Sequence, residues 1–179
     1  MASTEISGYT AYRRDRVDGR RAGGVVIYIR AEVPSARCTE LHHSAYEVIW
    51  IRSLLNSLPL YLAALYHPPS PRPRYKDEEF IAYIEDCLNT IAQQQANATI
   101  IWAGDCNQLS DDAVCALGLH SLVKQPTHMG SKLERVYCTA ELYNNIKVLS
   151  SAIKTKHSMV VARSDCKCIV DSNKKTFYS

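Results

Sequence analysis

The chain of 179 residues contains a short polar segment, Asp105-Cys106-Asn107, directly after an apolar run, and this segment could act on a phosphate ester. A carboxylate such as Asp105 can take a proton from water or hold a cation. The amide of Asn107, two residues later, points to the same side and can donate a hydrogen bond to a phosphate oxygen without adding negative charge. Asp and Asn after a strand also commonly cap a turn, so this ordinary interpretation stays open.

Two other residues could take part in the same chemistry. Tyr66 ends the run LYLAALY, and a phenol at a strand end can hydrogen-bond a phosphate. Asp165, in Ser164-Asp165 before CKCIV, could hold a metal or orient a base. An edge-of-core tyrosine and an acidic turn residue are the alternatives for these two positions.

Strand-like segments alternate with one helical segment, and together they would position these groups. Residues 22–30 follow a turn at Asp18-Gly19 and predict a hairpin strand. Residues 46–53 and 60–66 predict an antiparallel pair across Asn56-Ser57. Residues 77–95 predict a helix, because Phe80, Ile84 and Leu88 recur at steps of four after acidic residues in the first turn.

The rest of the chain predicts short elements around a buried strand. Four prolines in residues 67–74 predict an extended loop. The apolar run 99–104 is typical of a strand buried on both faces. We expect a short helix over 111–117, closed by Gly118, and strands over 133–138, 145–149, 159–162 and 166–170. This order favours an α/β protein with a mixed sheet over a regular βαβ repeat.

Composition excludes several classes of protein. Hydrophobic residues make up 46% and charged residues 22%, which suits one globular domain over 1–179. We expect no membrane segment, because no apolar run approaches about 20 residues. The first ten residues lack the pattern of a secretory signal, so we expect seven reduced, mostly buried cysteines. The net charge of +3 is too small to indicate nucleic-acid binding, although five arginines in residues 13–21 could contact phosphates or form a solvated hairpin tip.

Six segments follow one another along the chain: 8–30, 46–53, 65–71, 100–109, 125–137 and 160–170. In this order and near this spacing they resemble the endonuclease domain of non-LTR (LINE-type) retrotransposons, in the endonuclease/exonuclease/phosphatase (DNase I-like) superfamily. The resemblance implies a four-layer α/β/β/α sandwich of two mixed sheets, and a Mg²⁺-dependent phosphodiesterase that nicks DNA. We expect such a protein to be intracellular, and nuclear if it acts on DNA.

The resemblance also implies a role for each matching residue. Asp105 would be the general base that orients the attacking water, and Asn107 would hydrogen-bond the scissile phosphate near the metal. Tyr66 would contact that phosphate, and Thr127 would lie on the DNA-contacting rim. Asp165 would belong to a Ser-Asp-His ending, in which it orients the histidine. The implied metal ligands are Asp105, Asn107 and Asp165.

The sequence departs from the family at two of its blocks. The Leu-Asp-Arg block reads Leu133-Glu134-Arg135, which makes Glu134 the implied substrate contact with one extra methylene. The Ser-Asp-His ending is matched to residues 164–166, where Cys166 replaces the histidine, and a thiol is a weaker donor. His157 lies nearby in the sequence, but no pattern assigns it the missing position.

A third departure concerns the start of the chain. The family carries an Asn strand and a Glu-Thr-Trp block, with a metal-binding Glu, upstream of the point that matches Gly8. Only seven residues precede Gly8, so we expect an N-terminally truncated domain that lacks its first strands, with weak or absent nicking activity. The alternatives are a non-catalytic, degenerate fragment with residual DNA binding and a phosphatase of the same superfamily acting on small molecules.

Overall fold

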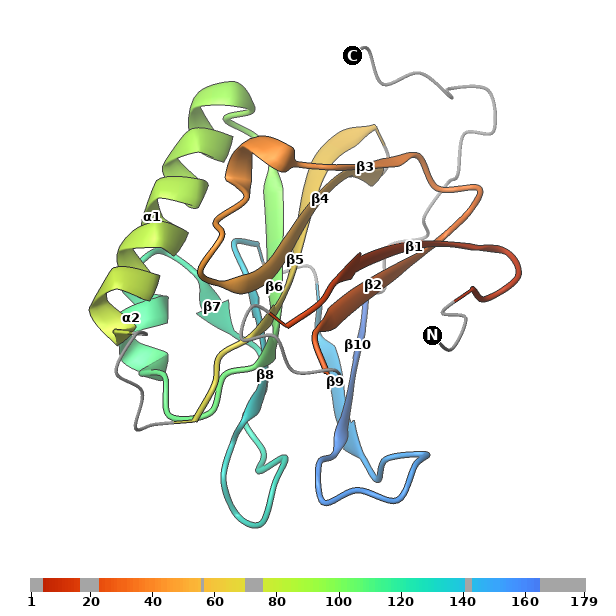
Figure 1. The fold of residues 1–179 in the computed structure, drawn as a ribbon, viewed down its shortest axis with the longest axis vertical. Coiled ribbons are helices and arrows are strands. Elements are labelled where there is room, and N and C mark those ends of the chain that lie inside the picture. The colour runs from red at the N-terminus through yellow and green to blue at the C-terminus, as the bar shows by residue number, and fades with distance from the viewer. Residues whose placement is uncertain (1–4, 17–22, 56, 70–75, 141–142, 165–179) are drawn as a thin grey trace.

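The computed structural model describes residues 5–16, 23–55, 57–69, 76–140 and 143–164 (Figure 1). It contains one six-stranded sheet, two two-stranded sheets and two α-helices. The elements are β1 (Tyr9–Arg14), β2 (Val25–Arg30), β3 (Ser35–Arg37), the 3₁₀ helix η1 (Thr39–Leu41), β4 (Glu47–Leu55), β5 (Leu58–Tyr66), α1 (Asp77–Gln94), β6 (Thr99–Asp105), α2 (Asp111–Cys115), β7 (His120–Ser121), β8 (Glu134–Cys138), β9 (Asn145–Leu149) and β10 (Met159–Arg163).

The six-stranded sheet is mixed, as the sequence predicts, and has the order β3-β4-β5-β6-β8-β7. β4 and β5 form the predicted antiparallel hairpin, with Val48 opposite Leu65. β5 and β6 run parallel, so their connection must cross over the sheet, and α1 forms this crossover. β8 then returns antiparallel to β6.

One face of the six-stranded sheet is covered by α1 and α2 (Figure 1). The apolar stripe of α1 faces this layer, with Phe80, Ile84 and Ile91 fully buried. Trp50 and Trp102 lie in the same core, as the sequence predicts. This face therefore holds the main hydrophobic core of the described chain.

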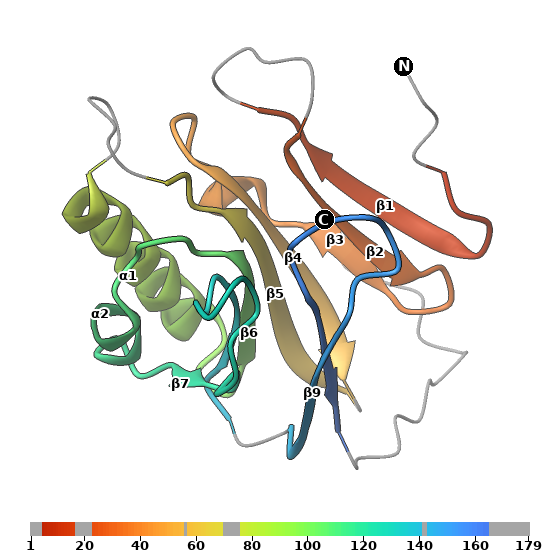
Figure 2. The same cartoon turned by 90° about the horizontal axis from the view of Figure 1, so that it is seen from below.

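The opposite face carries the two two-stranded sheets, β1-β2 and β9-β10 (Figure 2). Ile29 of β2 packs on Ile49 and Ile51 of β4, and β10 contacts β8. The two pairs do not join into one sheet among the described residues, and both described α-helices lie on the other face. The described chain thus has α-helices on one face of a mixed sheet and two separate β-hairpins on the other.

β6 differs from its prediction in burial. Ile100 and Trp102 are buried against the helices, whereas Ile101 and Ala103 on the other face are only partly buried. The expectation of burial on both faces is therefore wrong for the described residues, whose hairpins pack mainly on β4, β5 and β8.

The remaining predictions concern cysteines, turns and the chain ends. All five described cysteines are free thiols, and four of them are buried. Gly118 closes the turn after α2 with a φ of +84°. The predicted strand over 166–170, the turn at Asp18-Gly19 and most of the proline-rich loop lie outside the described residues. No helix of the described chain is both long enough and apolar enough to cross a membrane.

Candidate active site

Tyr66, Asp105 and Glu134 form a row across three neighbouring strands at one end of the six-stranded sheet. Tyr66 is the register partner of Asp105 between β5 and β6, and Asp105 is the partner of Glu134 between β6 and β8. The parallel strands β5 and β6 end here, and the antiparallel strand β8 begins here. Directly opposed residues point to the same face of a sheet, so these three side chains share the face that carries the hairpins.

The turn after β6 holds Asp105 and Asn107 in a fixed arrangement. A Cβ atom at Gly104 would lie 2.0 Å from the carbonyl oxygen of Leu65, so only glycine allows β5 and β6 to approach this closely. Asn107 adopts a φ of +41°, which asparagine tolerates better than most residues. Its backbone N–H donates to Asp105 Oδ1 at 3.2 Å, and its side-chain Nδ2 donates to the carbonyl of His67 at 2.7 Å.

His157 joins this row from the segment that precedes β10. Its Nδ1 donates a hydrogen bond to Glu134 Oε1. Asp105, Glu134 and His157 each offer one ligand atom, and these three atoms lie within 4.8 Å of one another. Glu134 Oε2 is buried without a hydrogen-bond partner, so this carboxylate has an unused acceptor inside the cluster.

Thr127 connects the two loops that carry Glu134 and His157. Its Oγ1 accepts hydrogen bonds from the backbone N–H groups of Leu133 and Glu134 at 2.9 and 3.0 Å. Its carbonyl accepts from the N–H of Ser158 at 2.8 Å. Thr127 is only 1% exposed and holds these loops behind the cluster, and its expected contact with DNA stays a prediction.

Arg135 fixes the other side of the turn. This buried guanidinium donates to the carbonyls of Leu109 at 2.6 Å, Lys132 at 3.0 Å and Asn107 at 3.1 Å. It therefore ties the turn after β6 to the start of β8, which are the two segments that carry Asp105 and Glu134.

The electrostatic environment of Asp105 is that of a partly buried acid beside a second acid. Burial raises the pKa of Asp105, and the charge of Glu134 raises it further. The backbone N–H of Asn107 and the nearby His157 act in the opposite direction. Two carboxylates that share a partly buried site favour a cation or a proton between them.

A cation fits this cluster by its donor set. Asp105 and Glu134 offer carboxylate oxygens, which divalent cations such as Mg²⁺ and Mn²⁺ prefer, and the unpartnered Oε2 of Glu134 is available. The imidazole of His157 adds a nitrogen, a donor that suits transition metals better than Mg²⁺. The residues that could hold a metal are therefore Asp105 and Glu134, with His157 as the third ligand.

Arginine from the basic segment reaches the same row. The guanidinium carbon of Arg16 lies 4.1 Å from the ring centroid of Tyr66, a cation–π contact. Arg16 also approaches Glu47, the register partner of Tyr66, at 3.7 Å. At least this arginine of the segment faces the site end of the sheet.

The structure brings four of the predicted site residues, Tyr66, Asp105, Asn107 and Glu134, to the same end of the sheet. Asp165 and Cys166 lie outside the described residues. His157 is the functional candidate that the sequence analysis missed. The signal was a histidine just before the apolar strand β10, but the preceding Thr155-Lys156 share nothing with the Ser-Asp of the expected ending.

No family model matches the sequence, and no curated protein matches it. The structure does match solved structures. The endonuclease domain of TRAS1, a telomere-specific non-LTR retrotransposon, superposes with a TM-score of 0.67 at 15% identity, over 90% of this chain and 82% of that one. An endonuclease/exonuclease/phosphatase family protein from Leptotrichia buccalis gives 0.60 at 12% identity, over 90% and 74%. D. rerio TDP2 complexed with a single-strand DNA product gives 0.53 at 15% identity, over 84% and 72%. The chain therefore has the fold shared by a retrotransposon endonuclease domain and an endonuclease/exonuclease/phosphatase family protein.

Proposed function

We propose that the chain is a divalent-cation-dependent phosphodiesterase that nicks DNA. The observation that supports this most directly is the convergence of Asp105, Glu134 and His157 within 4.8 Å, at the end of a sheet whose fold matches a retrotransposon endonuclease domain. Phosphodiester hydrolysis needs a base for water and positive groups around the phosphate. The row and its neighbours contain both kinds of group.

Asp105 and Glu134 would hold the cation, and His157 would complete the ligand set or face the phosphate. A bound divalent cation neutralises charge on the phosphoryl oxygens and lowers the pKa of water. Mg²⁺ remains the cofactor that the family resemblance implies, and the imidazole makes Mn²⁺ the sharper probe.

The residues of the chain then have these roles. Asp105 takes the proton of the attacking water. Tyr66 donates to the phosphate. Glu134 holds Nδ1 of His157 and so fixes the ring. The free Nε2 then serves either as the third metal ligand, with the imidazole neutral, or as a donor to a phosphate or leaving oxygen, with the imidazole protonated.

This assignment changes which departures from the family pattern should weaken nicking. Cys166 no longer marks the loss of the imidazole, because His157 supplies one beside Glu134. Asp165 stays a proposed ligand or orienting acid. Glu134 stands where the family has an aspartate, so we propose a nicking rate below that of a complete family member.

We also propose the finer layering that the resemblance implies. In this view the pairs β1-β2 and β9-β10 are the flanks of a second sheet that faces the six-stranded sheet. Their placement on one face of that sheet supports it (Figure 2).

The test is a supercoiled-plasmid nicking assay with Mg²⁺, Mn²⁺ or EDTA. Asp105→Asn keeps the shape of the side chain and removes the base, so we expect a loss of at least about 100-fold. Asp112→Asn, an exposed acid on α2, is the matched control and should leave the rate unchanged. Equal background in all three proteins, with DNA binding retained, would establish the non-catalytic alternative.

A further inference from the structure

A basic pocket lies at the open edge of β4, away from the catalytic row. β3 pairs only with Ile51 to Ser53 of β4, and the N–H of Cys38 then bonds the carbonyl of Trp50. The chain leaves the sheet at this point, so the first half of β4 has no partner strand on this side among the described residues. A cavity of about 260 Å³ opens there, lined by Arg14, Arg37, Thr39, His42 and the β4 edge, with Val48, Ile49 and Trp50 as its apolar wall.

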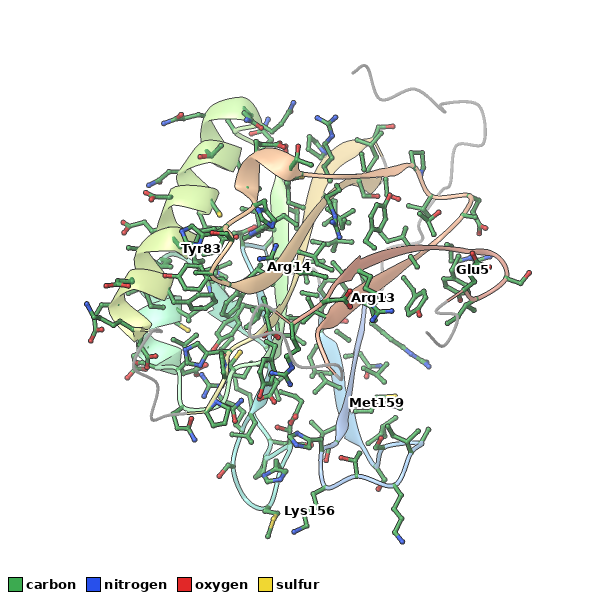
Figure 3. The ribbon with its side chains drawn as sticks, in the orientation of Figure 1. Glu5, Arg13, Arg14, Tyr83, Lys156 and Met159 are labelled. Carbon is green, nitrogen blue, oxygen red and sulfur yellow. The ribbon has the colours of Figure 1, made fainter. Side chains whose placement is uncertain are left out.

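Arg14, labelled in Figure 3, lines this cavity and is held there by hydrogen bonds. Its Nη2 donates to the carbonyls of His43 at 2.8 Å and Ser44 at 3.1 Å, and its Nη1 donates to His42 Nε2. Its Nε is buried and has no hydrogen-bond partner. The positive charge is therefore fixed in place by neutral acceptors and is not cancelled by them.

Arg37 adds a second cation that is more accessible. It is exposed, and its Nη2 donates to the carbonyl of Arg13 at 2.5 Å. In the described parts of the chain, no carboxylate forms an ion pair with Arg14 or Arg37. Glu47, the buried acid next to the pocket wall, approaches Arg16 at 3.7 Å, and its charge also acts on Arg14.

The pKa of His42 is consistent with an excess of positive charge in this pocket. Burial lowers the pKa of His42, and the charges of Arg14 and Arg37 lower it further. Burial also lowers the pKa of Arg14, although Tyr83 and Glu47 act against the shift. The two arginines therefore act together on the imidazole, and His42 stays a neutral donor at Nδ1 while its Nε2 accepts from Arg14.

The pocket is connected to the catalytic row by the basic segment. Arg16, two residues after Arg14, covers the ring of Tyr66, and Tyr66 is the register partner of Asp105. Positive groups thus lead from the row past Arg16 to Arg14 and Arg37. A polyanion with charges at regular intervals fits such an arrangement better than a single small anion does.

We infer that this pocket binds a backbone phosphate of the nucleic-acid strand at a distance from the phosphate that is cut. The inference rests on the proposed function, because it assumes that the strand lies along the row. Arg37, Thr39 and His42 contact the phosphate oxygens, and Arg14 supplies fixed charge behind them. The site positions the strand and carries no base specificity.

Binding without cleavage tests this inference separately from catalysis. We would measure the fluorescence anisotropy of a labelled 20-base-pair duplex in EDTA over a range of salt concentrations. Arg37→Gln removes one phosphate contact, so affinity at ~50 mM salt should fall about tenfold and the salt slope should shrink by about 0.9. Thr39→Glu introduces a carboxylate into the pocket and should weaken binding further. Arg30→Gln is the control. Arg30 is an exposed residue of β2 that forms an ion pair with Glu32, and this variant should bind like the parent chain.

Each outcome of this experiment decides the inference. Unchanged affinity and slope in both pocket variants, with unchanged melting temperatures, would overturn it. A phosphate-induced stabilisation that depends on Arg37, without any effect on duplex binding, would also overturn it and leave a site for free anions. Loss of nicking in Asp105→Asn gives no information about the pocket. A parent chain that binds DNA through Arg37 but does not nick it would contradict only the catalytic proposal.

Discussion

Asp105 and Glu134 oppose each other directly across β6 and β8, so the pairing of two strands places two carboxylates side by side. Such a pair is unfavourable in a sheet unless a cation or proton lies between the charges. His157 reaches one member of the pair, Glu134, from another part of the chain. The arrangement costs stability unless the two charges are neutralised, and is therefore the part of the molecule where function is best tested.

Glu134→Gln tests the cation site. Glutamine can still accept the hydrogen bond from His157, so the loop should stay in place while one charge is lost. We expect Mn²⁺ affinity, measured by isothermal titration calorimetry, to fall about tenfold or more. Glu85→Gln, on the exposed face of α1, should bind Mn²⁺ like the parent chain. Equal affinities for the two variants would remove Glu134 from the ligand set.

Asp105→Asn should stabilise the protein at neutral pH. The pKa of Asp105 is raised in the folded chain, so its favourable contribution exists below the unfolded pKa and is lost as pH rises through the folded pKa. The asparagine variant escapes this loss, and its melting temperature at pH 7 should exceed that of the parent by about 2 °C. Thermal unfolding at pH 3 and pH 7 checks the sign, since the gain should disappear at the lower pH. A variant that is less stable at pH 7 contradicts the assignment.

Arg135→Met should destabilise the fold strongly. The change leaves the carbonyls of Leu109, Lys132 and Asn107 without their buried donor, and we expect a loss of about 3 kcal/mol or more in the free energy of unfolding. Urea denaturation followed by circular dichroism measures it. Arg163→Met, at an exposed position on β10, is the control and should change stability by less than about 0.5 kcal/mol.

Gly104→Ala should lower the free energy of unfolding more than Gly118→Ala does, although both changes add one methyl group. A methyl group at Gly104 would lie 2.0 Å from the carbonyl oxygen of Leu65, whereas a methyl group at Gly118 has nothing within 4 Å. We expect a loss of about 3 kcal/mol or more at Gly104 and about 1 kcal/mol at Gly118, where only the positive φ is unfavourable. The same denaturation experiment compares them. Equal losses would show that β5 can move away from β6 without cost.

Local patterns predicted the helix α1, the hairpin of β4 and β5, and the position of Asp105 at the end of β6. These features follow from periodicity within one segment or from a turn between neighbours. The row from Tyr66 to Glu134 needs register across three strands, which the sequence does not contain by itself. The spacing within one turn paired Asp105 with Asn107, and only the family resemblance placed them together with Tyr66 and Glu134.

His157 shows why the rest of the site could not be predicted from the sequence. Its position depends on the bond between Ser158 and the carbonyl of Thr127, two residues that are far apart in the sequence. Thr127 is buried behind the cluster by hydrogen bonds to Leu133 and Glu134, which follow it by only six and seven residues but in an irregular loop. Neither pairing leaves a periodic pattern, so tertiary contacts alone decide both placements.

The β9-β10 pair forms a sheet of its own, and this should affect how the protein responds to heat. An isolated two-stranded ribbon is marginally stable, and within the described chain these two strands pair only with each other. We predict that the ribbon opens before the six-stranded sheet does, once the bond from Ser158 to Thr127 and the bond from His157 to Glu134 are broken, and that His157 then leaves the row. Warming should therefore abolish phosphodiester cleavage at a temperature where the helices are still folded.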